Sequence, residues 1–420
     1  MGAFLPASTP HSGIPELPDV LCFESRGRLK GMHSDAFIHL IFLIFAGAAV
    51  IATVALYARQ ALPVAYIVLG VAMGPWGLGW VGDVAILQGM AEFGIIFLLF
   101  LLGLNLEPRE LLQMLREAVV VTLVTCVVFF SAGAGVALVF GLDALQAVLI
   151  GAAVMFSSTI LGLKLLPTST LHHQRLGEII VAILLLQDII AIAVILFIQG
   201  FAGSANPIVD VGVLLLTAPL LFVLALGFCR YGLMALMQRF DQIQEYVFLI
   251  AIGWCMAVAV LAHEIGLSYE IGAFIAGVAI ATSPISRFIA ETLKPLRDFF
   301  LVVFFFALGA GFDMSLLPQI FWPAITLAAL LMLLKPFTFA LMLRRQNEKP
   351  GVSREIGIRL GQVSEFSLLV AVVGLQSGLM TDKASYIVQA TTILTFIAST
   401  YWIVLKVPTP IAISESLRKD

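Results

Sequence analysis

The stretch Ile179–Leu196 reads IIVAILLLQDIIAIAVIL and holds Gln187 and Asp188 side by side in an otherwise apolar run. A helix of about 20 apolar residues is long enough to cross the hydrocarbon core of a bilayer. A carboxylate in the middle of such a helix costs roughly 2.5–3.5 kcal/mol even on the lenient insertion scale, so it marks a candidate functional site. The stretch therefore predicts a membrane helix whose buried acid binds a proton or a transported cation.

The composition of the whole chain supports this interpretation. The chain has 420 residues, of which 61% are hydrophobic and only 12% are charged, whereas soluble domains carry about 25% charged residues. The net charge of -3 gives no reason to expect a nucleic-acid partner. The four cysteines have no paired spacing, so we expect small buried apolar residues, with no disulfide framework and no metal site. We expect a polytopic all-α membrane protein whose partners include membrane lipid.

Thirteen segments are long and apolar enough to be membrane-spanning helices, although the ninth and tenth are short and rich in glycine. They are residues 36–57, 62–81, 86–105, 118–140, 143–165, 176–199, 207–229, 244–263, 267–283, 299–312, 320–343, 355–377 and 384–406.

The basic residues alternate between the loops that join these segments. The odd-numbered loops and the C-terminal tail, each with the helix ends beside it, carry 18 Lys and Arg residues, and the even-numbered loops carry only Lys383. Because cytoplasmic loops are enriched in Lys and Arg, we expect a cytoplasmic C-terminus, an outside N-terminus and a multi-pass protein of the cell inner membrane.

The first residues break this alternation. Residues 1–31 are polar, have no apolar run typical of a signal peptide, and contain three basic residues on the wrong side. We expect the translated chain to start at Met32 or the segment to be a disordered tail. The predicted organisation is a polar tail over 1–34, a membrane domain over 35–407 and a cytoplasmic tail over 408–420.

Three successive hydroxyl residues, Ser157, Ser158 and Thr159, lie inside the fifth segment. They can simply bond back to helix carbonyls. They are also what an interrupted helix needs, because their side chains can satisfy freed backbone groups while their oxygens face a cation. Since segments five and six form a hairpin, these hydroxyls can lie near Asp188, which is the candidate ion carboxylate together with Gln187.

Further polar residues lie in the eleventh, twelfth and third segments. Lys335 stands next to a proline, where it can snorkel, donate to a carbonyl or pair with Asp188. Ser364 and Glu365 belong to a polar cluster that suits a second broken helix, and Glu365 can alternatively pair with Arg359. Glu92, near the outer end of segment three, is either an interfacial acid or part of the ion's access path.

The polar interruptions are related by symmetry. The break in segment five corresponds to the cluster in segment twelve, seven segments later, and Lys335 in segment eleven corresponds to segment four. An offset of seven segments relates opposite orientations. The chain therefore predicts two inverted six-helix halves joined by segment seven, with broken helices that cross at the midplane.

Six motifs occur in an order that resembles the membrane domain of the monovalent cation:proton antiporter-2 family, in particular the Kef-type potassium efflux proteins. The resemblance covers about residues 36–407 and implies the sodium/proton-antiporter fold, a homodimer and elevator-type alternating access. The motifs are GPWGL at 74–78, AEFG at 91–94, SSTI at 157–160, LQDI at 186–189, GAFIAG at 272–277 and GQVSEF at 361–366.

The resemblance also implies roles for individual residues. Asp188 would bind the proton and the cation in turn. Related sodium antiporters carry a second aspartate at the position of Gln187, and the glutamine here favours K⁺ over Na⁺ and an electroneutral one-for-one exchange. Kef-type proteins usually continue into a nucleotide-binding domain, and this sequence contains no strand–turn–helix unit with a G-x-G-x-x-G motif, so a separate cytoplasmic regulatory subunit would be needed for such control.

Two other classes of function are weighed against an antiporter. A ligand-gated cation efflux channel on the same fold would need that regulatory subunit and would show no obligatory proton coupling. An intramembrane enzyme is disfavoured because the chain contains neither H-E-x-x-H nor G-x-S-x-G. We therefore expect a transporter without catalytic residues, cofactor or metal.

Overall fold

A computed structural model describes residues 19–81, 84–104, 108–166, 175–201, 207–240, 243–283 and 285–409. Every long regular element in these ranges is a helix. Most of the predicted N-terminal tail over 1–34 and of the C-terminal tail over 408–420 lies outside the described residues. The described part of the first tail is helical, because α1 begins at Asp19.

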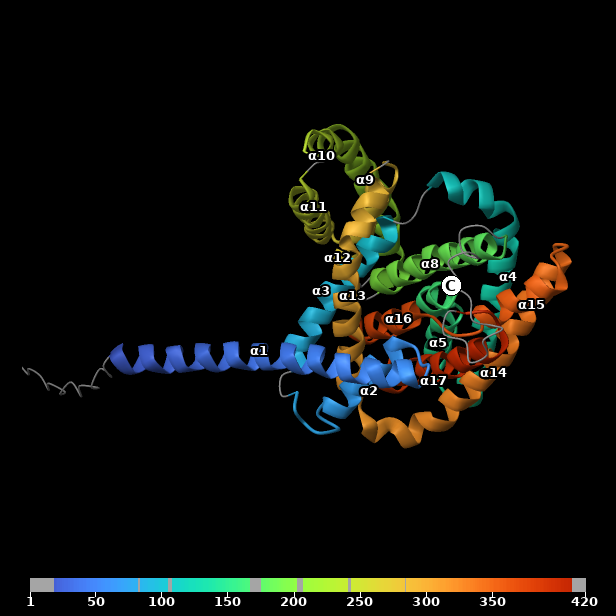
Figure 1. The fold of residues 1–420 in the computed structure, drawn as a ribbon, viewed down its shortest axis with the longest axis horizontal. Helices are drawn as coiled ribbons and strands as arrows, with labels where there is room; N and C mark the ends of the chain where they lie inside the picture. Colours follow the sequence, from blue (N-terminus) through green and yellow to red (C-terminus); the bar gives the residue numbers. More distant parts are fainter. Residues whose placement is uncertain are drawn as a thin grey trace, which may run out of the picture. The chain divides into compact units, whose positions relative to one another are not determined.

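Each of the thirteen predicted segments overlaps one or two of the described helices, which are coloured along the chain in Figure 1. Their bounds are α1 Asp19–Tyr57, α2 Leu62–Met73, α3 Val84–Leu104, α4 Pro108–Val139, α5 Ala144–Val154, α6 Thr159–Lys164, α8 Arg175–Phe201, α9 Pro207–Phe228, the π-helix η1 Cys229–Leu233, α10 Met234–Arg239, α11 Gln244–Glu264, α12 Tyr269–Ala281, α13 Ser286–Ala310, the 3₁₀-helix η2 Met314–Leu316, α14 Leu317–Arg345, α15 Pro350–Arg359, α16 Glu365–Gln376 and α17 Asp382–Lys406.

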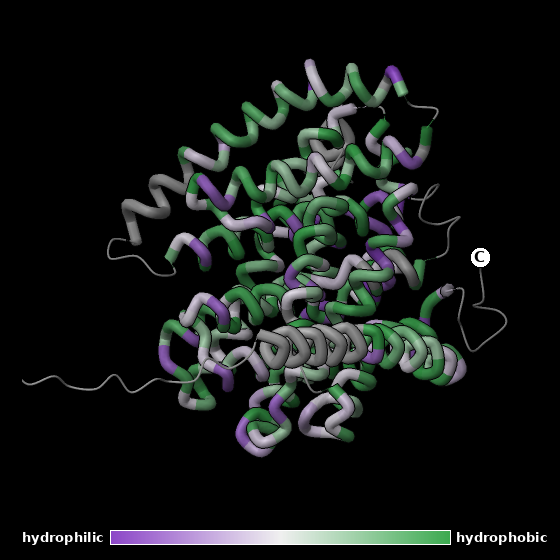
Figure 2. Tube along the Cα trace, turned by 90° about the vertical axis from the view of Figure 1, so that its left-hand side faces the viewer, coloured by the Kyte–Doolittle hydropathy of each residue, from purple (hydrophilic) through white to green (hydrophobic). Residues whose placement is uncertain are grey.

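The apolar character of these helices is that of a membrane protein. Seven described helices are long and apolar enough to cross a bilayer, and five more are shorter apolar helices. Figure 2 shows hydrophobic residues along most of the helices, with hydrophilic residues in scattered short stretches. The all-α fold is confirmed, and the count of thirteen crossings stays a prediction.

One group of helices surrounds the two predicted breaks. The fifth segment is divided into α5 and α6, and the twelfth into α15 and α16. These four helices pack with α4, α8, α14 and α17, which we call the crossing bundle. Figure 1 shows α5, α8 and α16 lying together, with α4 and α14 beside them. The two broken helices are therefore confirmed.

The remaining helices after α1 pack mainly with one another. We call α2, α3 and α9 to α13 the flanking bundle, in which α12 packs on α3 and α11, and α13 packs on α2 and α3. Its core is a single cluster of buried apolar side chains that draws on α3 and on the helices from α9 to α13. The α8–α9 pair forms one of the contacts between the two bundles.

Two pairs of glycines let helices of the flanking bundle touch backbone to backbone. A Cβ atom added to Gly70 or Gly309 would lie 2.1 or 2.0 Å from a carbonyl oxygen of the opposite helix, α13 or α2. The same holds for Gly103 and Gly277 in the α3–α12 pair, at 2.5 and 2.1 Å. In all four cases the carbonyl lies three residues before the partner glycine. Each glycine of the first half has a counterpart in the second half at a nearly constant interval. Gly277 lies 207 positions after Gly70, and Gly309 lies 206 positions after Gly103. The repeat of this contact supports the inverted two-fold relation between the halves.

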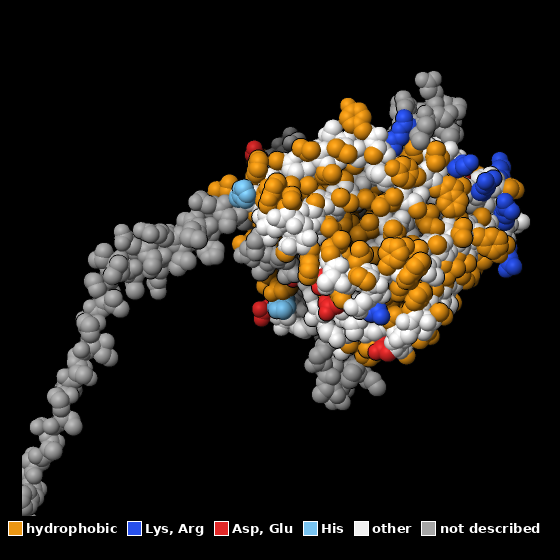
Figure 3. Space-filling model, turned by 90° about the horizontal axis from the view of Figure 1, so that it is seen from below, with side chains coloured by type: hydrophobic (Ala, Val, Ile, Leu, Met, Phe, Trp, Pro, Cys, Tyr) orange, Lys and Arg blue, Asp and Glu red, His pale blue; other side chains and the backbone are white. Residues whose placement is uncertain are grey.

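The surface carries its charges at the ends of helices. Figure 3 shows a face dominated by hydrophobic side chains, with Lys and Arg gathered at the edge where α14 leads into α15. The sequence there contains Arg344, Arg345, Lys349 and Arg354. Such a basic edge next to an apolar band is what the positive-inside rule predicts for a cytoplasmic face.

Candidate functional site

Both helix breaks are built by serine side chains. The segment 155–158 separates α5 from α6, and the segment 360–364 separates α15 from α16. The Ser158 hydroxyl accepts a hydrogen bond from the backbone N–H of Leu161 at 3.1 Å, and the Ser364 hydroxyl accepts one from the N–H of Phe366 at 3.1 Å. Because serine is a strong helix-capping residue, the sequence begins a new helix after each break.

The two breaks lie against each other. The Ser157 hydroxyl donates to the carbonyl of Leu360 at 2.9 Å, and the Ser367 hydroxyl donates to the carbonyl of Ala153. The amide nitrogen of Gln362 donates to the carbonyl of Ser158 at 3.4 Å. The backbone groups that the interruptions release are thus bonded by side chains of the opposite break, as an irregular backbone inside a membrane requires.

Lys335 of α14 joins the same two breaks. Its ammonium group is fully buried and donates to the carbonyl of Phe156 in one break and to the carbonyl of Gln362 in the other, the latter at 3.2 Å. It also lies 5.1 Å from the centre of the Phe129 ring, a cation–π contact from α4. Of the alternatives that the sequence left open for Lys335, the structure supports donation to carbonyls of the broken helices.

Gln187 of α8 supports the first break. Its side-chain oxygen accepts a hydrogen bond from the backbone N–H of Ser157 at 2.9 Å. Its amide nitrogen is buried and has no hydrogen-bond partner of ordinary geometry among the described residues, although the Cys126 thiol of α4 is close enough to interact with the side chain. An acid at this position could not keep the same arrangement without a counter-charge.

Asp188 occupies the centre of the site. Only 1% of its surface is exposed, and the Thr159 hydroxyl lies 3.3 and 3.2 Å from its two carboxylate oxygens. Thr159 is the first residue of α6, so the α6 N-terminus faces this acid. Glu365, the first residue of α16, is close enough for its charge to act on Asp188. No basic side chain of the described residues forms an ion pair with Asp188.

The predicted site residues therefore divide into three groups. Asp188, Thr159 and Glu365 come together around one buried carboxylate. Five others build the crossing that supports it, and they are Ser157, Ser158, Gln187, Lys335 and Ser364.

Glu92 of α3 forms the third group alone. It is exposed and accepts a hydrogen bond from Gln376 at 2.9 Å. Gln376 ends the α16 helix that Glu365 begins, so the two positions lie about 16 Å apart along its axis. The structure does not bring Glu92 to the carboxylate, and its place on an access path stays a prediction.

Arg359 is the alternative partner that the sequence offers for Glu365. The Arg359 guanidinium forms a 2.8 Å ion pair with Glu355, one turn earlier in α15. It also donates to the carbonyls of Leu165 and Pro408. Arg359 thus ties the end of the broken helix to neighbouring backbone segments.

Sequence reasoning missed the contribution of α17. The Thr395 hydroxyl accepts a hydrogen bond from the backbone N–H of Val363 at 3.1 Å, and the Ser399 hydroxyl donates to the Gln362 side-chain oxygen at 2.9 Å. Ser399 and Thr395 thus fix the second break from the side. The signal is visible in the sequence as buried polar residues at helical spacing in an apolar segment, namely Gln389, Thr391, Thr392, Thr395, Ser399 and Thr400.

This arrangement has a definite chemical capacity. A buried carboxylate and a threonine hydroxyl are hard oxygen ligands, which suit a proton or a hard cation. Among the described residues, no group of three or more His, Cys, Asp or Glu side chains could hold a metal ion. The site can neutralise Asp188 by protonation or by binding one cation.

The fold is shared with solved structures. The sodium proton antiporter MjNhaP1 of Methanocaldococcus jannaschii superposes with a TM-score of 0.68 at 19% identity, covering 88% of this chain and 95% of that one. A second structure of MjNhaP1 gives a TM-score of 0.63 at 17% identity, with 88% and 96% covered. At these identities the likeness shows the sodium/proton-antiporter fold.

The sequence comparisons point the same way. The family model described as "Sodium/hydrogen exchanger, transmembrane" matches residues 40–406. The iron transporter MagA of Paramagnetospirillum magneticum is 27% identical over 82% of this chain and 80% of its own length. The K(+) efflux antiporters 5 and 4 of Arabidopsis thaliana are each 27% identical, over 74% and 81% of this chain. The chain spans only 56% and 59% of the length of those two antiporters.

Proposed function

Because this chain belongs to the sodium/hydrogen exchanger family, whose model matches residues 40–406, we propose that it exchanges K⁺ for H⁺ across the inner membrane. The family is one of transporters, and the resemblance to monovalent cation:proton antiporters is confirmed by the relatives. Potassium is favoured because two of those relatives are K(+) efflux antiporters, and because a glutamine at position 187 is what the resemblance to Kef-type proteins implies for a potassium antiporter. Na⁺ is the second candidate.

The observation that carries this proposal is the environment of Asp188. The acid is 1% exposed, receives a hydrogen bond from Thr159 and has no basic ion-pair partner among the described residues. A bare carboxylate in that place is costly, and a proton or a monovalent cation neutralises it. Competition between the two for Asp188 is then the mechanism, because only the neutralised site crosses the membrane cheaply.

The stoichiometry follows from the charge of the site. Gln187 carries no charge, and Lys335 is held by two backbone carbonyls instead of by an acid. One carboxylate that trades one proton for one singly charged cation moves no net charge.

Alternating access would be provided by movement of the crossing bundle against the flanking bundle. The whole ion site lies in the crossing bundle, so a rigid movement of that bundle carries Asp188 with it. We place the flanking bundle at the interface of a homodimer, with the basic loops and the C-terminus on the cytoplasmic side and the N-terminus outside. A separate regulatory subunit would act from the cytoplasmic side.

Exchange in proteoliposomes tests this proposal. The purified protein is reconstituted with an internal pH dye, and K⁺, Na⁺, Li⁺ and Rb⁺ are added in turn. We expect K⁺-dependent proton movement at carrier rates, with a weaker response to Na⁺. Cation flux without proton movement, at rates far above those of a carrier, would instead support the gated cation efflux channel.

A further inference from the structure

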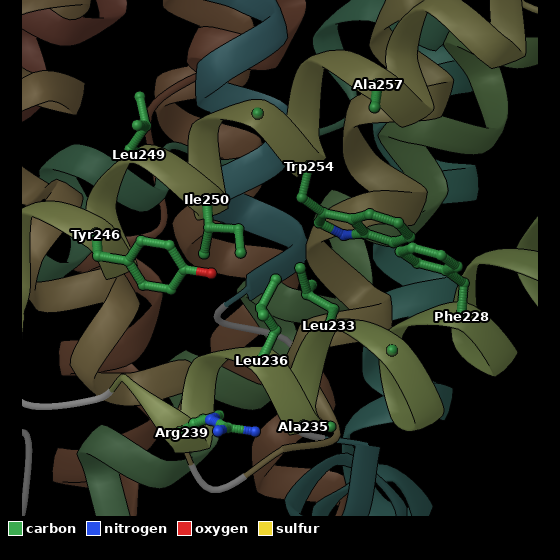
Figure 4. A pocket seen from close by; sticks show the side chains of 12 residues that line it. Phe228, Leu233, Ala235, Leu236, Arg239, Tyr246, Leu249, Ile250, Trp254 and Ala257 are labelled. Atoms are coloured by element: carbon green, nitrogen blue, oxygen red, sulfur yellow. The ribbon is translucent and has the colours of Figure 1, made fainter.

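An apolar groove lies in the flanking bundle, between α9–α10 and α11. It has a volume of about 790 Å³, and Figure 4 shows the side chains that line it. Arg239 is the one charged residue among its lining side chains, and Tyr246 adds a phenolic hydroxyl to the lining. The groove belongs to no part of the ion site, which lies in the crossing bundle.

The shape of the groove follows from its sequence. The π-helix η1 interrupts the run from α9 to α10, and small residues replace bulky ones where the two walls meet. Gly253 of α11 is one of these, and a Cβ atom added to it would meet no atom within 4 Å. Trp254 forms part of the wall, where its ring stacks on Phe228 and its N–H donates to the carbonyl of Ala276 at 3.1 Å. These contacts hold the Trp254 side of the wall in place, and the space beside Gly253 is free of protein atoms.

The charge of the groove is confined to one end. Figure 4 shows Arg239 and Tyr246 toward one end and Trp254 and Ala257 toward the other. Arg239 is exposed and forms no ion pair with any described residue. The neighbouring acid Glu245 does not line the groove. In the predicted topology Arg239 lies in a cytoplasmic loop, at the depth of lipid headgroups.

The length of the groove matches one leaflet. Tyr246 and Ala257 are eleven residues apart on α11, which is about 16 Å of helix. Half of a hydrocarbon core of about 30 Å is about 15 Å. A groove that starts at the headgroup level and ends near the midplane has the dimensions of an acyl chain from a single leaflet.

We propose that this groove binds an acidic phospholipid of the cytoplasmic leaflet, with one acyl chain along Gly253 and Trp254 and its phosphate group against Arg239. The apolar walls would hold the acyl chain, and the Arg239 guanidinium, which forms no ion pair with a described residue, would complement the charge of the phosphate. A cytoplasmic leaflet that contains anionic lipids attracts basic side chains at its surface.

Substitutions in the groove can test the binding of the acyl chain and of the headgroup separately. Gly253→Leu places a bulky side chain in the hollow, where an added Cβ atom would meet no atom within 4 Å. Arg239→Gln removes the charge and keeps the apolar lining. Gly227→Leu is the matched control, because Gly227 is also in a helix with open space at its Cβ position and does not line the groove. Ala235→Leu fills the same hollow from α10 if Gly253→Leu does not fold.

Lipid retention is measured by native mass spectrometry of the purified full chain with phosphatidylglycerol or phosphatidylcholine of identical acyl chains. We expect the wild type and Gly227→Leu to prefer phosphatidylglycerol by about fivefold, the effect of one basic group at about 1 kcal/mol. Arg239→Gln should lower this preference to about one, and a filled groove should retain less of both lipids.

Two outcomes would overturn the proposal. One is that folded Arg239→Gln and the folded groove-filling variants retain as much phosphatidylglycerol as the wild type does. The other is loss of a dimer in the same spectra on filling the groove, with lipid retention unchanged, since the groove would then be a contact with a second copy of the chain.

Discussion

Asp188 depends on a single described hydrogen-bond donor, the Thr159 hydroxyl. Its oxygen is also within reach of any cation that binds the carboxylate. Thr159→Val, a change of nearly equal volume, removes this oxygen ligand, so we expect it to weaken the apparent cation affinity. The measurement is the cation dependence of exchange, and Thr159→Ser should restore it. Unchanged affinity in Thr159→Val would show that the hydroxyl is only structural.

Lys335 illustrates how a buried charge can serve the backbone. Lys335→Gln leaves at least one carbonyl of the two breaks without its donor, at about 1–3 kcal/mol. We expect lower thermal stability or rate with transport that stays electroneutral, while the exposed Lys406→Gln stays like the wild type. Currents on a solid-supported membrane after a proton or cation jump are the measurement. A wild-type transient that Lys335→Gln abolishes would contradict this role and assign the proton to the lysine.

Among the elements, α2 and α13 cross with their backbones in close contact. An added Cβ at Gly309 would come within 2.0 Å of the carbonyl oxygen of Ile67, so Gly309→Ala has to push the two helices apart. We expect a loss of stability of at least 1–3 kcal/mol, roughly the cost of overpacking. Gly135→Ala on α4, with no atom within 4 Å, is the control. Equal melting temperatures of the two variants in detergent would contradict the observed crossing.

The helix breaks were predictable from the sequence because clusters of hydroxyl and amide side chains in apolar segments supply the donors and acceptors that an interrupted helix needs. Ser157–Thr159 and Gln362–Ser364 both lie where the helices are interrupted. The partners of those breaks were not predictable. Thr395 and Ser399 meet the second break only through the packing of α17, which no local pattern encodes. The partner of Glu92 was not predictable for the same reason, since its position along α3 does not reveal that Gln376 of α16 faces it.

At the scale of the whole molecule, hydrogen bonds between described residues join the crossing bundle to the flanking bundle. Gln376 donates to Glu92 at 2.9 Å, and Tyr386 donates to the carbonyl of Gly311 at 3.1 Å. The third joins α8 to α12 at 3.5 Å. In the predicted topology all three lie on the outer side, opposite the basic loops. The movement of one bundle against the other that we propose would have to break them, so we expect these bonds to favour a state that is closed to the outside.

Weakening these contacts should therefore open the outer side. In a background without the native cysteines, we expect Gln376→Ala combined with Tyr386→Phe to increase labelling of a cysteine introduced at Thr159 by an impermeant thiol reagent added outside. Ser377→Ala is the matched control, because that hydroxyl bonds only within its own helix. Equal labelling in the double variant and the control would mean that these bonds do not hold the state.

The central claim, that Asp188 binds the proton and the cation in turn, is tested most directly by Asp188→Asn. An amide has nearly the same shape but cannot take up and release a proton at physiological pH. Exchange is measured in proteoliposomes with an internal pH dye, beside the exposed control Asp382→Asn. We expect Asp188→Asn to be folded and to show no cation-dependent proton movement, while Asp382→Asn exchanges like the wild type. Proton-coupled exchange that persists in Asp188→Asn would contradict the account.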